Sequence, residues 1–284
     1  MMADLDGKTC VLTGATSGIG EQTALALARG GARLHLVARS DERAAATRTR
    51  IRDETGNDAV AIHRADLASL AEIRRVADEL LEACPRIDLL LNNAGIVNLS
   101  RETTVDGFEA TFAVNHLAYF ALTNLLLDRL RASAPARIVN VASDAHKFGA
   151  VDLDDLQGER EYKAMRSYGR SKSANILFTV ELARRLEGSG VTVNAVHPGP
   201  VATRLGKNNG WFGRVATTVL SPFFLTPAKG ARTSIHVLTA PELATVSGRY
   251  FAKQREITPQ SHATDPDTAR RLWDQSVQLT GIGA

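Results

Sequence analysis

Short apolar runs alternate with longer amphipathic segments along nearly the whole chain. The runs are typical of buried strands, and segments with apolar residues every three or four positions are typical of helices. Strands are expected over Thr9–Thr13, Arg33–Ala38, Ala59–His63, Leu89–Asn92, Arg137–Val141, Thr192–His197 and Gly248–Phe251. Helices are expected over Gly18–Arg29, Asp41–Glu54, Leu70–Ala83, Asp106–Arg131, Tyr168–Glu187 and Ala228–Thr239. This alternation predicts an α/β fold, with a doubly wound, seven-stranded parallel sheet and helices on both faces.

Two stretches interrupt the alternation, residues 146–166 and residues 200–226. Both follow strands, and ligands of open α/β sheets bind beyond the carboxyl ends of the strands. We therefore expect both stretches to line a substrate pocket, with 200–226 as its lid. The lid carries the aromatic residues Trp211, Phe212, Phe223 and Phe224, which favours an apolar substrate. The alternative is that these rings simply pack onto the sheet.

No segment has the composition of a linker, a repeat or a low-complexity tract, so residues 1–284 are expected to form a single domain, with residues 252–284 as a C-terminal extension. A net charge of +3, from 34 basic and 31 acidic residues, is too small to indicate nucleic-acid binding. Two cysteines make no disulfide framework, and seven histidines lack ligand spacing, so no metal site is expected.

Neither a signal peptide nor a membrane span is expected from the sequence. Residues 1–8 have no apolar stretch of the kind that signal peptides carry. The longest uncharged apolar stretch, residues 215–228, contains Pro222 and Pro227 and is too short to cross a bilayer. With its unpaired cysteines, the chain is typical of a cytoplasmic protein without a transmembrane segment.

A glycine-rich run lies between the first expected strand and the first expected helix. In that position, backbone N–H groups at the start of a helix can bind a pyrophosphate. Gly14 would allow a tight exit from the strand, Gly18 would admit the phosphates, and Gly20 would let helix and strand approach closely. The candidate cofactor-binding residues of this run are Gly14, Thr16, Ser17, Gly18, Ile19 and Gly20. A turn that binds no nucleotide is the alternative.

The end of the second strand indicates which dinucleotide is bound. An acidic residue there would bind the adenosine 2′-hydroxyl of NAD, whereas Arg39 can pair with the 2′-phosphate of NADP. NADP is therefore favoured, the alternative being that Arg39 is an ordinary surface residue. Asp66 and Leu67 follow the third strand and are expected at the adenine, although Asp66 could instead cap the next helix. Asn93, Ala94 and Gly95 follow the fourth strand, where small residues suit the adenosine ribose or a structural turn equally.

A tyrosine and a lysine four residues apart supply the candidate acid–base chemistry. Tyr168 and Lys172 would share one helix face. A free phenol has a pKa near 10, and a neighbouring ammonium is expected to lower it toward neutrality. Ser143, after the fifth strand, could hold a substrate oxygen. Asn115, inside an expected helix, could hold a water chain that leads from the lysine to solvent.

Taken together, these motifs resemble the short-chain dehydrogenase/reductase family over nearly the whole chain. The residues that carry the resemblance are Thr13–Gly20, Asp66, Asn92–Gly95, Asn115, Ser143, Tyr168, Lys172 and the stretch Pro198-Gly199-x-x-x-Thr203. The resemblance implies an NAD(P)-binding Rossmann domain with a catalytic tetrad of Asn115, Ser143, Tyr168 and Lys172. It also implies that Tyr168 is the general acid in reduction and that Tyr168 and Lys172 contact the cofactor. Pro198, Gly199, Val201 and Thr203 would hold the nicotinamide carboxamide.

Within the family, the chain is most similar to the retinol-dehydrogenase-like branch, which includes the WW-domain-containing oxidoreductase. That similarity lies in the stretches 154–158, 171–178 and 269–273. The catalytic chemistry that it implies is interconversion of an alcohol and its ketone or aldehyde, without implying a retinoid substrate. With Arg39 and the aromatic lid, the chain is expected to be an NADP-dependent oxidoreductase that acts on a small hydrophobic substrate. No N-terminal anchor and no WW domain are expected, and a homo-oligomer is possible. The alternatives are an NADP-binding regulatory protein without turnover and an NAD-preferring alcohol dehydrogenase of the same family.

Overall fold

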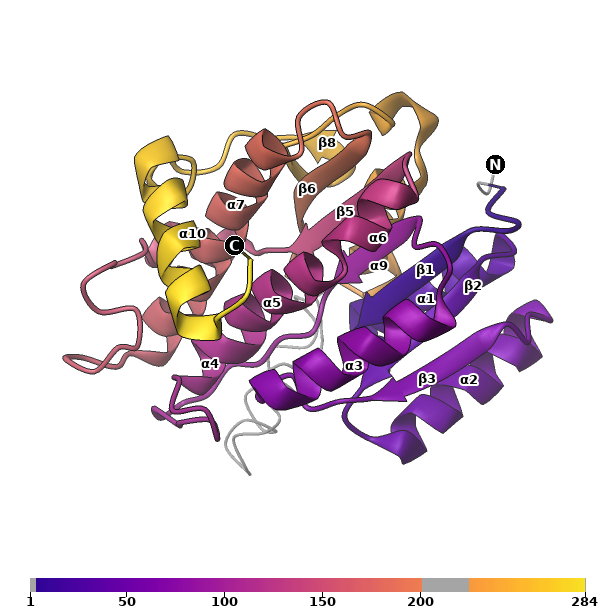
Figure 1. Cartoon of the computed structure of the whole chain (residues 1–284), viewed down its shortest axis with the longest axis horizontal. Coiled ribbons are helices and arrows are strands. Elements are labelled where there is room, and N and C mark those ends of the chain that lie inside the picture. Colours follow the sequence, from indigo (N-terminus) through magenta and orange to yellow (C-terminus); the bar gives the residue numbers. More distant parts are fainter. Residues whose placement is uncertain (1–3, 201–224, 284) are drawn as a thin grey trace.

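The computed structural model describes residues 4–200 and 225–283. In this part of the chain eight strands form one sheet in the order β3-β2-β1-β4-β5-β6-β7-β8, which Figure 1 shows in the middle of the molecule. The strands are β1 (Thr9–Thr13), β2 (Arg33–Ala38), β3 (Val60–Arg64), β4 (Leu89–Asn92), β5 (Ala136–Val141), β6 (Val191–His197), β7 (Tyr250–Ala252) and β8 (Arg255–Glu256). All neighbouring strands are parallel except β7 and β8. The predicted doubly wound α/β fold is therefore confirmed.

The predicted number of strands needs one correction. All seven expected strands form, but β8 adds a short antiparallel edge strand that makes the sheet mixed. Lys253 and Gln254 take positive φ values of 49° and 62° and turn the chain back onto β7. β8 consists of two exposed charged residues, so it carries no apolar run by which a strand would be predicted.

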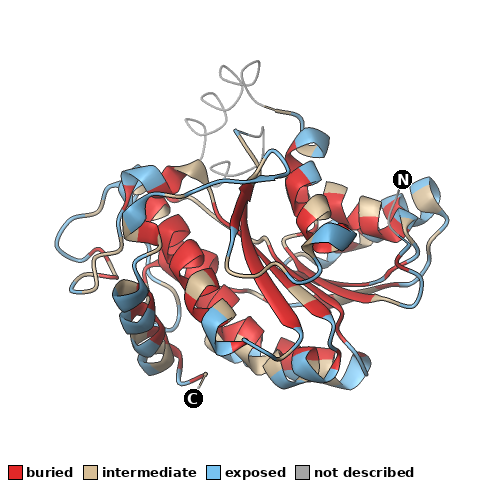
Figure 2. Cartoon of the chain, turned by 90° about the horizontal axis from the view of Figure 1, so that it is seen from above, coloured by how far each residue is buried: buried red, intermediate tan, exposed pale blue. Residues whose placement is uncertain are grey.

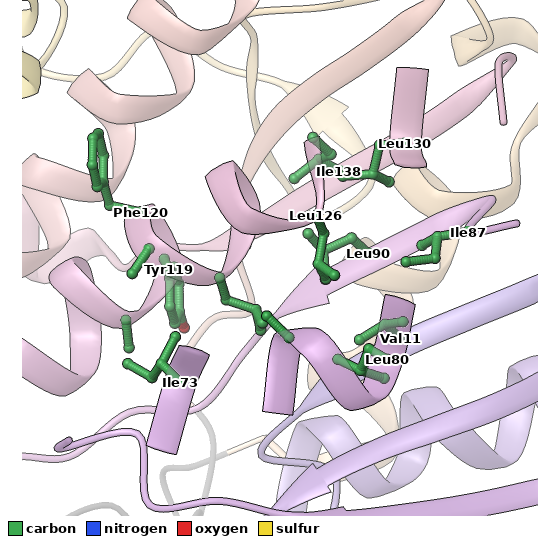
Figure 3. Packing of buried hydrophobic residues seen from close by; sticks show 14 of the residues in the cluster. Val11, Ile73, Leu80, Ile87, Leu90, Tyr119, Phe120, Leu126, Leu130 and Ile138 are labelled. Atoms are coloured by element: carbon green, nitrogen blue, oxygen red, sulfur yellow. The ribbon is translucent and has the colours of Figure 1, made fainter. Parts of the chain in front are cut away.

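Alternate residues of the central strands face opposite layers of helices. Val11 belongs to a core with helices α3, α5 and α7, whereas Cys10 and Leu12 belong to a core with α1, α2 and α9. Figure 2 shows the sheet and the inner sides of the helices buried and the outer sides exposed. In Figure 3, Leu80 of α3 and Leu126 after α5 lie near Val11, Leu90 and Ile138 of the strands. Burial of both faces explains why the strands are continuous apolar runs.

The helices begin and end at the following residues: α1 Gly18–Arg29, α2 Asp41–Thr55, α3 Leu70–Ala83, α4 Ala110–Phe112, α5 Ala118–Leu125, α6 Leu127–Ala132, α7 Ala164–Arg185, α9 Pro227–Thr239 and α10 Pro266–Thr280. Shorter 3₁₀ turns are η2 (Asp144–Phe148), η4 (Pro241–Leu243) and η5 (Ser261–Ala263). No described helix is long and apolar enough to cross a membrane.

Two of the helix predictions differ from the structure. The helix expected over Asp106–Arg131 begins at Ala110, contains the π-helical turn η1 (Ala113–Leu117), and is divided at Leu126. α7 begins at Ala164, one turn before the expected Tyr168, so Tyr168 lies inside the helix. The π turn contains Asn115, and such turns are frequent at functional sites.

The C-terminal extension contains helix α10, which Figure 1 shows in yellow beside α7. Asp265 caps its first turn by accepting a hydrogen bond from the backbone N–H of Thr268, and Gly281 ends it at φ 62°. Its Trp273 ring packs edge-on against Phe120 and stacks on Phe178. α10 thus adds a further layer over the α5 and α7 side of the sheet.

Candidate active site

The glycine turn between β1 and α1 is too tightly packed to accept larger residues. Gly14 has φ 67°, and a Cβ there would lie 2.7 Å from the Ala94 Cα. A Cβ on Gly20 would lie 2.4 Å from the Gly14 carbonyl oxygen and 2.5 Å from Asn93 Nδ2. Gly18 has φ 61°. Ser17, the N-cap of α1, makes no side-chain capping bond, so its hydroxyl leaves the N-terminal N–H groups of α1 to other partners.

The loop after β4 is joined to this turn by hydrogen bonds. Asn93 Nδ2 donates to the carbonyl oxygens of Thr13 and Gly14, both at 3.0 Å. Thr13 Oγ1 accepts from the backbone N–H groups of Asn93 and Ala94 at 2.9 and 3.1 Å. Tyr119 Oη donates to the Ala94 carbonyl at 2.8 Å. β1 and β4 are neighbours at the point where the strand order reverses, which is where dinucleotides bind in such sheets.

Arg39 and Asp66 lie together beyond the ends of β2 and β3. The Arg39 guanidinium is 3.9 Å from an Asp66 oxygen, and the two side chains are 67% and 46% exposed. Asp66 Oδ1 accepts from the Ala68 N–H, whereas α3 is capped by Ser69. The alternative role of Asp66 as the helix cap is therefore wrong. Leu67 is buried in the core.

Tyr168 and Lys172 share one face of α7, with Lys172 Nζ 5.6 Å from the centre of the Tyr168 ring. Lys172 is 3% exposed, and its Nζ donates to the Val141 carbonyl at 3.0 Å. A Cβ on Gly95 would lie 3.7 Å from Lys172 Nζ and 3.2 Å from Asn115 Oδ1. The side chains of Lys172 and Asn115 therefore both lie next to Gly95, in the loop after β4.

Burial, rather than the lysine charge, governs the acidity of this pair. Burial raises the pKa of Tyr168 to about 12, and a hydrogen bond with Ser143 offsets part of that rise. Burial lowers the pKa of Lys172 to about 7. The expectation that Lys172 brings the tyrosine pKa toward neutrality is thus wrong, because burial of the phenol has the larger effect and raises its pKa.

Ser143 and Asn115 each hold a backbone segment of the site. Ser143 is the N-cap of the turn η2, and its Oγ accepts from the Ala145 N–H at 3.2 Å. Asn115 accepts from the Ile96 N–H at 2.8 Å and donates to the Ile96 carbonyl and to Ser171 Oγ, both at 3.0 Å. Its expected role in a water chain stays a prediction.

The loop after β6 begins beside the Ser143 turn. His197 Nδ1 accepts from the backbone N–H groups of Asp144 and Gly199, at 3.1 and 3.4 Å. Pro198 and Gly199 are therefore close to the end of β5. The other expected residues of this loop and its lid lie outside the described residues, namely Val201, Thr203, Trp211, Phe212, Phe223 and Phe224.

Three residues of the site make contacts that were not predicted from the sequence, namely Thr13, Tyr119 and His197. Thr13 ends β1, and a polar residue at the carboxyl end of a buried strand is a usable signal in an α/β protein. Tyr119 and His197 offer no comparable signal, because their partners come from distant parts of the chain.

Comparisons with known proteins identify the family. Residues 8–210 match the short chain dehydrogenase family. The chain belongs to the short-chain dehydrogenase/reductase family. It is 48% identical to human retinol dehydrogenase 13 over 99% of this chain and 87% of that protein, and 45% identical to mouse retinol dehydrogenase 14 over 98% and 87%. The predicted retinol-dehydrogenase-like resemblance is confirmed.

Solved structures agree with this assignment. An uncharacterised protein of Mycobacterium paratuberculosis is 32% identical with a TM-score of 0.81, over 99% of this chain and 96% of that one. The Pseudomonas aeruginosa RhlG/NADP active-site complex is 30% identical with a TM-score of 0.70, over 87% and 95%. Membership of the family supports an NAD(P)-linked oxidoreductase that acts on alcohols or carbonyls.

Proposed function

We propose that this protein reduces apolar aldehydes or ketones with NADPH, with Tyr168 as the proton donor. The observation that carries the proposal is the placement of Tyr168 and Lys172 on one face of α7, with Lys172 Nζ 5.6 Å from the centre of the tyrosine ring. Ser143 lowers the pKa of the same tyrosine. A protein that only bound a dinucleotide would not need this arrangement. Reduction is the proposed direction, because cells keep most NADP in the reduced form.

The residues around the glycine turn fit a dinucleotide. Gly14 and Gly20 leave no room for a Cβ, and Ser17 makes no side-chain capping bond at the start of α1. These residues would hold the pyrophosphate, and Arg39 would pair with a 2′-phosphate. When bound, NADPH supplies the hydride.

The proton that the substrate oxygen takes up would come from a side chain of the protein. Tyr168 Oη would donate its proton to the carbonyl oxygen of the substrate as negative charge develops there, and the Ser143 hydroxyl would hold the same oxygen. Lys172 would stabilise the phenolate left behind, because its ammonium form lies close to the ring. Because burial raises the pKa of Tyr168, the phenol is protonated at neutral pH, which is the form that a proton donor needs.

The substrate is proposed to be apolar, as for the relatives named retinol dehydrogenases. Decanal, all-trans-retinal and an alkyl ketone form a suitable panel, with consumption of NADPH as the readout. We expect Tyr168→Phe to lower kcat by roughly 10²- to 10⁴-fold, the usual contribution of a general acid. Tyr250→Phe is the matched control, because the buried Tyr250 hydroxyl has no hydrogen-bond partner among the described residues.

The outcome separates the proposal from its alternative. Turnover of no panel member by the parent, despite tight NADPH binding, would favour the regulatory protein without turnover. Equal turnover by the parent and by Tyr168→Phe would show that another group donates the proton.

The preference for NADPH over NADH is proposed to depend on Arg39. A charged hydrogen bond of this kind contributes about 1.5–3 kcal/mol, so Arg39→Asp should reduce the preference for NADPH over NADH by roughly 10- to 100-fold. The RhlG/NADP complex supports this choice, because it is a 30% identical relative solved with NADP. An unchanged ratio of kcat/KM for the two cofactors would instead favour the NAD-preferring alternative or another 2′-phosphate ligand.

A further inference from the structure

The turn that carries Ser143 is held from outside by residues 257–263, which we call the C-terminal strap. His146, in η2, is 1% exposed and uses both ring nitrogens. Its Nδ1 lies 2.8 Å from the Ser143 carbonyl oxygen, and its Nε2 accepts from the Gln260 N–H at 3.2 Å. Because a carbonyl can only accept and an N–H can only donate, the ring must be neutral, with its hydrogen on Nδ1. Burial lowers the pKa of His146, which favours that form.

A second strap residue holds the backbone of the same turn. His262 Nε2 lies 3.0 Å from the His146 carbonyl oxygen and 3.4 Å from Ser173 Oγ. Ser173 Oγ in turn lies 2.7 Å from the Gly149 carbonyl oxygen, at the far end of η2. The strap therefore contacts the turn through both the ring and the carbonyl of His146.

On its other side the turn is pressed against α7. A Cβ on Gly169 would lie 2.5 Å from the Ala145 carbonyl oxygen, and one on Gly149 would lie 2.4 Å from the Arg170 nitrogen. Gly169 directly follows Tyr168, so this contact fixes the distance between the Ser143 turn and the tyrosine helix. The turn is thus enclosed between α7 and the strap.

We infer that His146 and His262 are positioning residues, through which the C-terminal strap holds Ser143 in register with Tyr168. This inference rests on the proposed role of Ser143. The strap lies beyond residues 8–210, the part that matches the family model. Nothing in it contacts the glycine turn or Arg39 among the hydrogen bonds of the described residues. Loss of the strap contact should therefore reduce catalysis while NADPH binding is retained.

Two substitutions of His262 make a matched pair. The glutamine side-chain nitrogen reaches about as far as His Nε2, whereas that of asparagine falls short. His262→Gln should keep donation to the His146 carbonyl, and His262→Asn should lose it. Since misplacement of a reacting group by about 1 Å lowers rates by roughly 10²-fold, we expect His262→Asn to lower kcat by roughly 10- to 100-fold. His262→Gln should keep most of the parent kcat, and the Kd for NADPH should be unchanged in both.

The experiment measures kcat with the fastest panel substrate, the Kd for NADPH and the thermal midpoint in both variants and in Ser143→Ala. Equal kcat in both His262 variants and the parent, together with collapse in Ser143→Ala, would overturn the positioning role alone. An equal loss of kcat in both His262 variants, together with a lower thermal midpoint in both, would also overturn it. Such a result would mean that the substitutions destabilise the whole protein. Retained activity in Ser143→Ala would instead refute the proposed function of that residue.

Discussion

Acid should destabilise this protein through a histidine that anchors α10 to the core. His116 is fully buried among aromatic rings, with ring centres 5.0 Å from Phe112 and 6.1 Å from Phe178. Its Nε2 lies 3.1 Å from Ser276 Oγ on α10. Burial lowers the pKa of His116 to about 4, because a charge there would have to leave water for an apolar contact.

The size and sign of the effect follow from proton linkage. The unfolded chain binds the proton with a pKa of about 6.5 and the folded chain with a pKa of about 4. Each pH unit between these values corresponds to about 1.4 kcal/mol, so the neutral, buried ring contributes about 3 kcal/mol to the free energy of unfolding. Since the folded pKa is the lower one, this contribution is complete above about pH 6.5 and is lost as the pH falls toward about 4.

Urea unfolding of the parent and of His116→Gln at several pH values between about 7 and 4 isolates this contribution. We expect the parent to lose about 3 kcal/mol more than the variant over that interval, whatever the offset between them at neutral pH. His236→Gln, at a partly exposed position on α9, is the control and should follow the parent. Parallel curves for the parent and His116→Gln would refute the reasoning, because another group would then take up the proton.

Two further substitutions test the packing that positions the site. Gly20→Ala would bring a methyl group to 2.4 Å from the Gly14 carbonyl, so we expect a loss of about 1–3 kcal/mol in unfolding free energy and weaker NADPH binding. Unfolding and NADPH titration together check this, and unchanged values would contradict the close approach. Trp273→Ala should cost about 3–5 kcal/mol, because the ring packs against both Phe120 and Phe178 and beneath Arg185. Asp274→Ala, at an exposed position on the same helix, should stay within about 0.5 kcal/mol of the parent in the same assay.

The parts of the fold that follow from local pattern were predictable from the sequence. The strands β1 to β7 are apolar runs, since both faces of the sheet are covered, and such runs are visible without coordinates. The π turn at Asn115 was not predictable, because the apolar pattern passes through it without a break. α10 was not predicted, although Asp265, Pro266 and Gly281 are ordinary start and stop signals for a helix.

The residues of the site were predictable from their spacing and from the strand ends that they follow, but the acidity and most of the contacts were not. The spacing of Tyr168 and Lys172 correctly placed them on one helix face. Their acidity was not correctly predicted, since burial, a property of the whole fold, exceeds the effect of the neighbouring charge. His146, His197 and His262 appeared scattered in the sequence, because their partners come from segments far away along the chain.

The role of Tyr168 is tested most directly by a single turnover. Parent and Tyr168→Phe are each saturated with NADPH, mixed with the fastest panel aldehyde, and followed by nicotinamide absorbance. We predict equal affinity for NADPH but a rate of hydride transfer roughly 10²-fold or more lower in the phenylalanine variant. Hydride transfer at the parental rate in that variant would contradict the assignment of the proton to this tyrosine.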